Sequence, residues 1–531
     1  MRSVMTHQFS MIPHTSIPRS VFNRSHGYKT TFDSGYLIPF FVDEVLPGDT
    51  FSLTASLFGR LATPIVPIMD NIFLETFFFY VPQRLLWDNW QKFNGEQENP
   101  GDSTDYLMPQ IACPPGGWAV GSLSDYFGLP TEVPGLMDIR SCWHRAYNLI
   151  WNEWFRDQNL QDSVPVPKDD GPDPDSNYLL LRRGKRHDYF TSCLPWPQKG
   201  PGVELPLGTT APVYAGDIHP MPANAVSTLT FRDTYTWQSP PNDRYLELGA
   251  GGRLYSAQPA TGSGTNQITP ANLYADLSNA TAATINSLRQ AFQIQKLLER
   301  DARGGTRYTE ILRSHFGVVS PDARLQRPEY LGGSHTRINV NPVQQTSSSD
   351  EVTPQGNLAA YGVFGDTFHG FSKSFVEHGV IIGLVNVRAD LTYQQGVNRK
   401  FTRKTRFDFY WPALSHLGEQ AVLNREIYAT GTPTDEEAFG YNERWSEYRY
   451  FPSQITGKFR STYAQSLDIW HLSQKFENLP TLSNQFIQDQ PPIKRILAVT
   501  DEPEILFDSF ITYRCARPMP VYSVPGLIDH F

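Results

Sequence analysis

The sequence has few cysteines, and their spacing argues against a disulfide framework. No two of them form a CxxC pair, which is the usual sign of a zinc site, a redox motif or a small secreted scaffold. We therefore expect free thiols in a reducing compartment. The 4 cysteines among the 531 residues are Cys113, Cys142, Cys193 and Cys515.

Long hydrophobic runs are absent as well. The N-terminal segment 1–20 has no apolar core of the kind that a secretory signal carries. The strongest apolar run, residues 72–81, contains Glu75 and falls far short of the ~20 residues that a membrane-spanning helix needs. The sequence predicts a protein that is made and works without insertion into a membrane.

Charge is also scarce. Charged residues make up 19% of the chain, below the roughly 25% usual for soluble proteins, and the formal net charge is −9. With 42 prolines and 39 glycines, the composition indicates a globular, loop-rich protein. A large surface buried between subunits would explain the low charge.

Catalytic and metal-binding signatures are missing from the chain. The glycine pairs lack the strand-then-helix context of a phosphate loop, and no GxSxG motif is present. The aspartate-rich residues 168–177 lack the ligand spacing of a calcium loop, which favours a solvated loop. Nothing distinguishes Glu436, Glu437 or Glu443 as the paired acids of a glycosidase. We expect no enzyme, no cofactor and no metal.

The clearest positive signal is β-alternation. In residues 50–59, apolar side chains alternate strictly with threonine and serine, which predicts a strand with one buried face. Residues 71–82 are apolar on both faces apart from Glu75, which predicts a strand buried on both sides. Residues 379–393 and 504–526 are two further candidate strands. Because these segments span most of the chain, we expect one discontinuous β-domain, residues 1–531, with long insertions.

Helical patterns are confined to the insertions. Apolar residues recur at helical spacing in 81–95, 137–155, 285–305 and 306–317. Asp138 is the predicted N-cap of the second helix, and glycines close the third.

A change of composition marks residues 209–284, which are rich in glycine, alanine, serine, threonine and asparagine. A disordered linker is one reading, but such segments are poor in aromatic residues. An ordered excursion is favoured here, anchored by aromatics that include Tyr214, Trp237, Tyr245 and Tyr255.

Two clusters of cations stand out from this acidic chain. The first comprises Arg399, Lys400, Arg403, Lys404 and Arg406 around Phe401, and the second comprises Arg182, Arg183, Lys185 and Arg186 before two aromatics. The N-terminal segment 1–32 is basic as well, with four cations and no acid. Each cluster is either a solvated or subunit-pairing surface, or a single-stranded nucleic-acid site in which cations track phosphates and aromatics stack on bases.

Several long blocks, in order along the chain, carry a family resemblance. They are RSVFNRSHGYKTTFDSGYLIPFFVDEVLPGDTF, FFYVPQRLLWDNWQKFNGE, CLPWPQKG, FQIQKLLERDARGGTRYTEILRSHFGV, DFYWPALSHLGEQAV and VPGLIDHF. The chain resembles the major capsid proteins of gokushoviruses, a branch of the Microviridae that infects bacteria. The resemblance runs from about residue 18 to the C-terminus and is interrupted mainly at 209–284.

The resemblance implies a mainly β fold, a single eight-stranded antiparallel jelly roll with large inserted loops carrying a few helices. It implies a structural protein of the virion, assembled in the host cytoplasm, with sixty copies forming a T=1 icosahedral shell around circular single-stranded DNA. Residues 209–284 would form a threefold protrusion that meets a host receptor. A small basic DNA-packaging protein, a scaffolding protein and a pilot protein are the implied further partners.

Two other functions are alternatives. A carbohydrate-binding or glycan-cleaving β-sandwich would also show alternation, aromatics and long loops. A trimeric receptor-binding spike is usually fibrous, and the chain lacks the repeats that such fibres show. Four tryptophans, Trp87, Trp90, Trp411 and Trp445, are assigned either to subunit interfaces or to the core.

Overall fold

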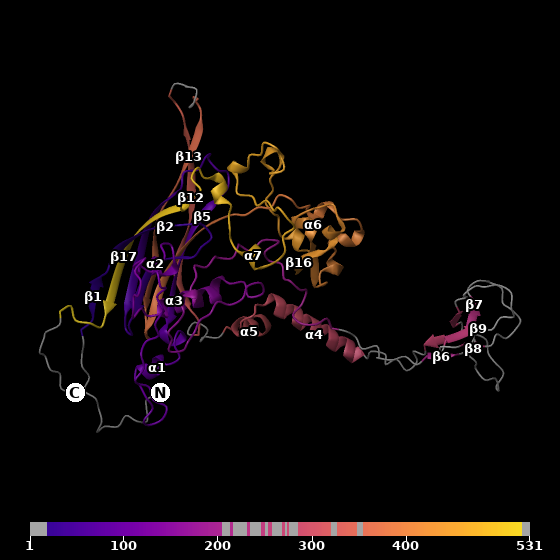
Figure 1. Ribbon diagram of the computed structural model, residues 1–531, viewed down its shortest axis with the longest axis horizontal. Coiled ribbons are helices and arrows are strands. Elements are labelled where there is room, and N and C mark those ends of the chain that lie inside the picture. The colour runs from indigo at the N-terminus through magenta and orange to yellow at the C-terminus, as the bar shows by residue number, and fades with distance from the viewer. Residues whose placement is uncertain are drawn as a thin grey trace. The chain divides into compact units, whose positions relative to one another are not determined.

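Long antiparallel strands from both ends of the chain lie side by side in the computed structural model (Figure 1). The structure describes residues 18–203, 285–319, 326–347 and 354–522, together with six short strands between 213 and 275. The long strands are β1 (Ser20–Asn23), β2 (His26–Phe32), β3 (Ile38–Val45), β4 (Thr50–Leu61), β5 (Ile72–Pro82), β12 (Glu329–Gln344), β13 (Leu358–Ser374), β14 (Gly379–Ala389) and β17 (Ile505–Arg517). A small sheet pairs β15 (Glu419–Leu423) with β16 (Ala438–Glu443).

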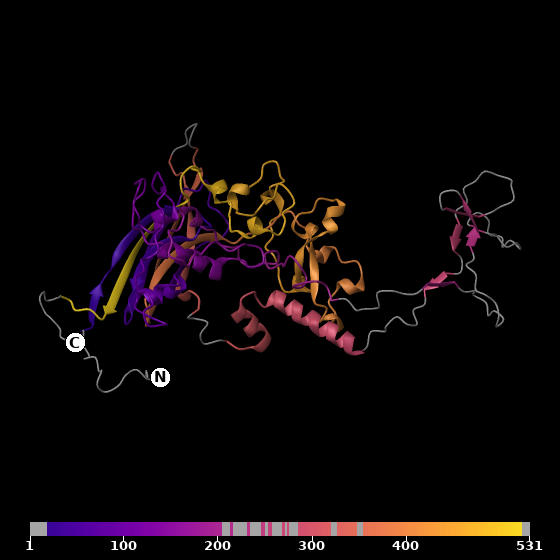
Figure 2. The ribbon, with the colours of Figure 1, turned by 60° about the horizontal axis from the view of Figure 1, so that its bottom comes forward.

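The strands pair in a nested order. The first strand position, shared by β1 and β2, pairs with the last strand, β17; β3 pairs with β14; β4 pairs with β13; and β5 pairs with β12. The four N-terminal strand positions thus pair with the four C-terminal ones in reverse order, which makes one long two-stranded ribbon. This ribbon is rolled up, so that β17 also pairs with β4 and β14 also pairs with β5. In both views the yellow strand β17 lies beside the indigo N-terminal strands (Figure 1, Figure 2).

This order is that of a jelly roll. One face of the roll is β2-β17-β4-β13 and the other is β3-β14-β5-β12, with β12 and β13 joining the two. The expected fold class, a mainly β, eight-position antiparallel jelly roll with inserted loops and few helices, is confirmed.

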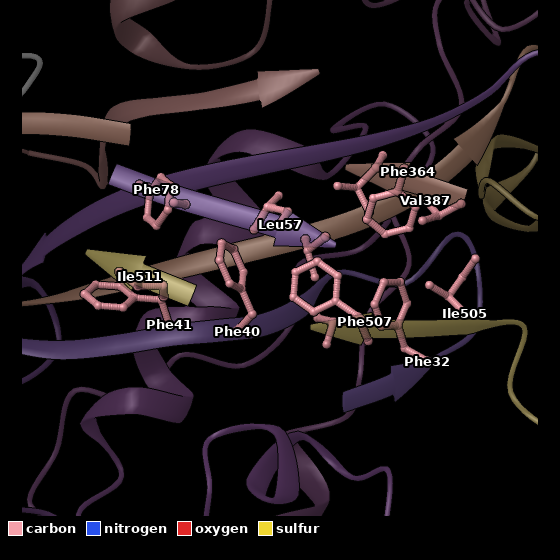
Figure 3. Close-up of a cluster of buried hydrophobic side chains, with 14 of the residues drawn as sticks. Phe32, Phe40, Phe41, Leu57, Phe78, Phe364, Val387, Ile505, Phe507 and Ile511 are labelled. Carbon is pink, nitrogen blue, oxygen red and sulfur yellow. The ribbon is translucent and has the colours of Figure 1, made fainter. Parts of the chain in front are cut away.

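The core between the two faces is strongly aromatic. Phe507 of β17 lies 5.7 Å, centroid to centroid, from Phe40 of β3 and 6.4 Å from Phe364 of β13, and Phe32 packs at its edge (Figure 3). The alternating apolar residues predicted in β4 all point into this core and are at most 4% exposed. Burial of each such side chain stabilises the fold by about 1.5–3 kcal/mol.

A second apolar layer covers the other side of the β3-β14-β5 face. Val380, Ile382 and Leu384 of β14 pack there with residues of the inserted helix α3 (Cys142–Ile150), while their neighbours Ile381 and Val385 face the jelly-roll core. Every residue of β14 is buried, and the prediction that residues 71–82 are buried on both sides is confirmed in β5.

Two of the predicted helices hold and two need correction. The helices are α1 (Trp90–Phe93), α2 (Leu123–Tyr126), α3, α4 (Ile285–Arg303), α5 (Tyr308–Phe316), α6 (Asn424–Ile427) and α7 (Asn484–Ile487). Helices α4 and α5 match their predictions, and α5 ends at Gly317 in the left-handed conformation that a closing glycine supplies.

The single helix predicted over 81–95 is wrong. The amide of Asp88 donates to the carbonyl of Lys168 instead of continuing a helix, so only a turn and the short α1 form. The N-cap predicted at Asp138 is also wrong. Arg140 first pairs with Gln110 in a β-bridge, and the helix begins after Ser141.

Residues 200–298 form a compact unit of their own, and 1–199 with 299–531 form the other. Six short strands of the first unit pair in nested order: β6 (Val213–Ala215) with β11 (Leu273–Ala275), β7 (Phe231–Asp233) with β10 (Ile268–Pro270), and β8 (Leu246–Gly249) with β9 (Arg253–Ser256). The pairs close one inside the next, as in a long hairpin.

Among the described residues, no helix is both long enough and apolar enough to span a bilayer. The four cysteines are free thiols, three of them buried.

Candidate nucleic-acid interface

The first cation cluster lies on irregular turns rather than on a regular element. Short 3₁₀ turns occupy Arg399–Phe401 and Arg406–Asp408. Asp408 closes the second turn by accepting hydrogen bonds from the amides of Thr405, at 2.7 Å, and Lys404, at 2.9 Å, and these bonds lower the pKa of its carboxyl. Because the turns have no fixed period, neighbouring cations point in different directions.

Two of the five cations turn inward and pair with buried acids. Arg399 Nη2 lies 2.7 Å from Glu426 Oε1, and the Glu426 side chain is 3% exposed. Arg403 Nη2 lies 3.5 Å from Glu447 Oε1, and the guanidinium packs over the ring of Tyr448. These two arginines neutralise acids of their own subunit and hold the turns against α6 and against the 3₁₀ turn Ser446–Tyr448.

The other three cations, Lys400, Lys404 and Arg406, are exposed, and no ion pair is found for them in the part of the chain that the structure describes. Exposed rings surround them. Lys400 Nζ lies 4.9 Å from the ring centroids of both Phe401 and Phe451. We call these three cations and the nearby exposed aromatics the basic–aromatic surface. Its rings are Phe401, Phe407, Phe409, Tyr410, Trp411 and Phe451.

The second cluster is largely internal. Arg182 stacks over the ring of Tyr36 at 3.9 Å and donates to backbone carbonyls. Lys185 donates to Gln474 Oε1 at 3.1 Å, and burial lowers the pKa of its ammonium to about 8. Arg186 alone is half-exposed.

Glu75, the one acid of β5, explains much of this cluster. Its Oε1 lies 2.6 Å from Arg388 Nη2, 2.8 Å from His335 Nδ1 and 3.6 Å from Arg186 Nη2. Its Oε2 pairs with Arg183 Nη1. Three arginines and a histidine thus gather around one nearly buried carboxylate. The arginines of the second cluster therefore have a structural role in neutralising Glu75, whether or not they also bind a ligand.

Two adjoining cavities bring the sequence-distant clusters together. The first, about 430 Å³, is lined by Arg399, Phe401 and Glu426 among others. The second, about 320 Å³, is lined by residues that include Lys185 and Arg186. The wall that the cavities share consists of Tyr189, Phe190, Tyr393, Tyr450, Pro452 and Ser453. The two clusters therefore meet at one region of the subunit, although 213 residues separate Arg186 from Arg399.

Sequence reasoning missed the aromatic partners of this region. Tyr448, Tyr450 and Phe451 come from the segment WSEYRYF at 445–451, in which rings alternate with charges, and that alternation could have indicated them. Trp87 and Trp445 are core residues, 0% and 3% exposed, so an interface role for their side chains is wrong. Trp411 is 51% exposed and Trp90 is half-buried.

The loop 168–177 is exposed over most of its length, as predicted, but its aspartates also bond to the fold. Asp173 is 2% exposed and accepts from the buried guanidinium of Arg145, at 2.6 and 2.7 Å. Asp170 and Asp175 accept from the indole nitrogens of Trp87 and Trp118, both at 2.7 Å. These bonds fix the loop to residues that pack in or beside the second apolar layer.

In the described ranges, no group of three or more histidine, cysteine or acidic side chains is placed to hold a metal.

The residues predicted for the protrusion lie in the unit 200–298. Tyr214 belongs to β6 and Tyr255 to β9. Trp237 and Tyr245 lie outside the described residues.

Comparison with known proteins assigns the family. The model of the family described as "Capsid protein (F protein)" matches residues 10–527. The capsid protein VP1 of Bdellovibrio phage phiMH2K is 52% identical over 99% of this chain and 98% of its own. The VP1 proteins of Chlamydia phage 1 and Spiroplasma virus 4 are 47% and 39% identical, also over nearly the whole of both chains. The chain therefore belongs to the capsid proteins of the Microviridae, of the VP1 type found in gokushovirus-like phages, and it is a structural component of the virion rather than an enzyme.

Proposed function

We propose that this capsid protein assembles as sixty copies into a T=1 icosahedral shell that encloses circular single-stranded DNA. A closed shell of identical copies repeats the same fivefold, threefold and twofold contacts, each of which needs complementary surfaces. Family membership supports the shell, and the low charge of the chain supports extensive contact between copies. The carbohydrate-binding and spike alternatives lose their support, because the family match covers almost the whole chain.

The basic–aromatic surface is the observation that carries the DNA part of the proposal. Lys400, Lys404 and Arg406 are free to meet phosphates, and the exposed rings beside them can stack on bases, each stack contributing about 1–3 kcal/mol. A subunit with a net charge of −9 cannot neutralise a genome by itself. A small basic packaging protein and counterions therefore carry most of that charge. Scaffolding and pilot proteins remain predicted partners.

Neutralising the surface tests this role. Phage carrying Lys400→Gln, Lys404→Gln and Arg406→Gln should form particles that hold less DNA, measured as DNA mass per purified particle. Lys475→Gln with Lys494→Gln is the control for a loss of exposed positive charge elsewhere, because both lysines lie outside this surface and pair with Glu477 and Asp33. Normal DNA content in the triple variant would remove the DNA role. Soluble subunits that fail to form particles would assign the three cations to subunit contacts instead.

The unit within 209–284 is the proposed host-contact protrusion at the threefold axis. Its nested strand pairs form an excursion that can vary at its tip without altering the jelly roll, and loops with this property commonly carry recognition. Replacing Trp237 and Tyr245 by serine should leave particle yield and DNA content unchanged and reduce adsorption to the propagating host strain. Unchanged adsorption, also after replacement of Tyr214 and Tyr255, would refute the proposed contact.

A further inference from the structure

The β2-β17-β4-β13 face of the jelly roll has an outer side that no second apolar layer covers in the described structure. Positions that alternate with the core residues point outward there, and they include large apolar side chains. Phe58 of β4 is 59% exposed, Phe510 of β17 is 54% exposed and Leu506 is 51% exposed. Exposed phenylalanines on the middle of a sheet need a reason, since burying them elsewhere would stabilise the subunit.

The register places the two rings next to each other. Phe58 lies directly opposite Asp508 and Phe510 lies opposite Ser56, so the two rings are diagonal neighbours, about 7–8 Å apart at the backbone, with Asp508 beside both. On the other side, Phe58 lies opposite Gly365 of β13, where an added Cβ would meet only the carbonyl oxygen of Leu57, at 3.9 Å. The glycine at 365 therefore leaves an open place beside the ring of Phe58, with room for a planar group.

The charge of this face is positive. Asp508 is the one acid at the outward positions of the four strands, and it is already paired with Lys29 at 3.2 Å. Arg60 and Arg514, one near each end of the rings, are exposed and have no ion pair in the described part of the chain. Hydroxyl groups line the strands between them: Ser52, Thr54, Ser56, Thr367 and Thr512.

We propose that this outer face is a second binding surface for single-stranded DNA, with Phe58 and Phe510 stacked on bases and with Arg60 and Arg514 on phosphates. The inference rests on the proposed enclosure of DNA and adds a site that is separate in sequence and structure from the basic–aromatic surface. A flat sheet with exposed aromatic rings is a surface on which unpaired bases stack. A protein partner would leave two arginines and a row of hydroxyls to be desolvated, whereas a phosphate backbone pairs with both.

Ultraviolet cross-linking of DNA inside intact particles, followed by peptide mass spectrometry, tests the inference. Cross-linked nucleotides are expected on the peptides that contain Phe58 and Phe510. The double variant Phe58→Leu, Phe510→Leu should lose these adducts and retain particles, because leucine keeps the apolar character and removes the ring. Phe316→Leu, which replaces an even more exposed phenylalanine of α5, is the control.

The outcomes separate the claims. Particles with normal DNA content and no adduct on either peptide would overturn this inference and leave the proposed function standing. The same holds if another protein chain is found to cover the outer side of the β2-β17-β4-β13 face. Particles that contain no DNA would overturn both. With the purified full-length chain and a labelled oligothymidine, the double variant should bind at least about fivefold more weakly per lost stack. Loss of Arg60 and Arg514 should reduce the slope of log affinity against log salt by about 0.7 for each contact. Unchanged affinity and slope would contradict the assignment.

Discussion

Arg388 Nη2 of β14 lies 2.6 Å from Glu75 Oε1 of β5, and both side chains are almost fully buried in the sheet. Glu75 also explains part of the basic segment at 182–186, because Arg183 pairs with its other carboxylate oxygen and Arg186 lies 3.6 Å from Oε1. An acid in an apolar strand needs cations from elsewhere in the chain, because a buried charge is tolerated only when it is paired.

Replacement of this acid should be costly. Glu75→Gln leaves Arg388 and Arg183 buried without a counter-charge, and we expect the free energy of unfolding to fall by about 3–5 kcal/mol. Urea unfolding of the purified subunit measures this change. The exposed Glu502 provides the control, since Glu502→Gln should alter stability by less than about 0.5 kcal/mol. Similar, small effects in both variants would show that the Glu75 cluster contributes little to stability.

Replacing an inward-facing cation of the first cluster should cost more stability than replacing an outward-facing one. Arg399→Gln leaves Glu426 buried and unpaired, and we expect a loss of about 3 kcal/mol or more. Lys400→Gln changes an exposed side chain and should stay within about 0.5 kcal/mol of the wild type. Thermal unfolding of both variants checks the assignment. Equal losses of unfolding free energy in the two variants would contradict the assignment of Arg399 as inward-facing and Lys400 as outward-facing.

Asp489 should make stability depend on pH. Burial raises the pKa of its carboxyl from 3.8 to about 7. Between these values the folded protein retains a proton that the unfolded chain has released, so the free energy of unfolding falls as the pH rises through this range and is constant above it. Asp489→Asn removes this fall, and the variant should gain up to about 4 kcal/mol over the wild type at pH 8.

Unfolding at pH 4 and pH 8 tests the sign of this effect. The advantage of Asp489→Asn should be near zero at the lower pH and largest at the higher one. Asp501→Asn, at an exposed site, should show no such difference. An advantage that shrinks as the pH rises would contradict the raised pKa.

Gly59 of β4 should not tolerate a side chain. A Cβ there would lie 2.0 Å from the ring of Phe364, which fills the core at this point. We expect Gly59→Ala to destabilise the subunit by about 1–3 kcal/mol through overpacking. Gly116→Ala is the control, because nothing lies within 4 Å of a Cβ at that position. A Gly59→Ala variant as stable as the wild type would show that the ring of Phe364 can move to make room for the methyl group.

The sequence predicted the strands well because a half-buried strand has a fixed period of two. β4 and β5 were recognisable from their apolar positions alone. The nested order of the strands was not readable in this way, because pairing of β2 with β17 joins residues nearly 500 positions apart. Only the family resemblance implies that order.

The sequence predicted which residue types form the candidate site, but not which of their side chains face inward and which face outward. Arg399 and Lys400 are neighbours in sequence, yet one pairs with a buried acid and the other is exposed. Irregular turns have no periodicity from which such directions follow. The environment of Trp87 was not readable for a related reason, because its indole nitrogen donates to Asp170, which lies 83 residues away.

An icosahedral reconstruction of DNA-filled particles tests the central claim most directly. The account predicts closed shells in a T=1 arrangement, each subunit a jelly roll, with Lys400, Lys404 and Arg406 turned toward the DNA. Particles that never close in the presence of their helper proteins, or shells in which these three side chains face the outside, would contradict it.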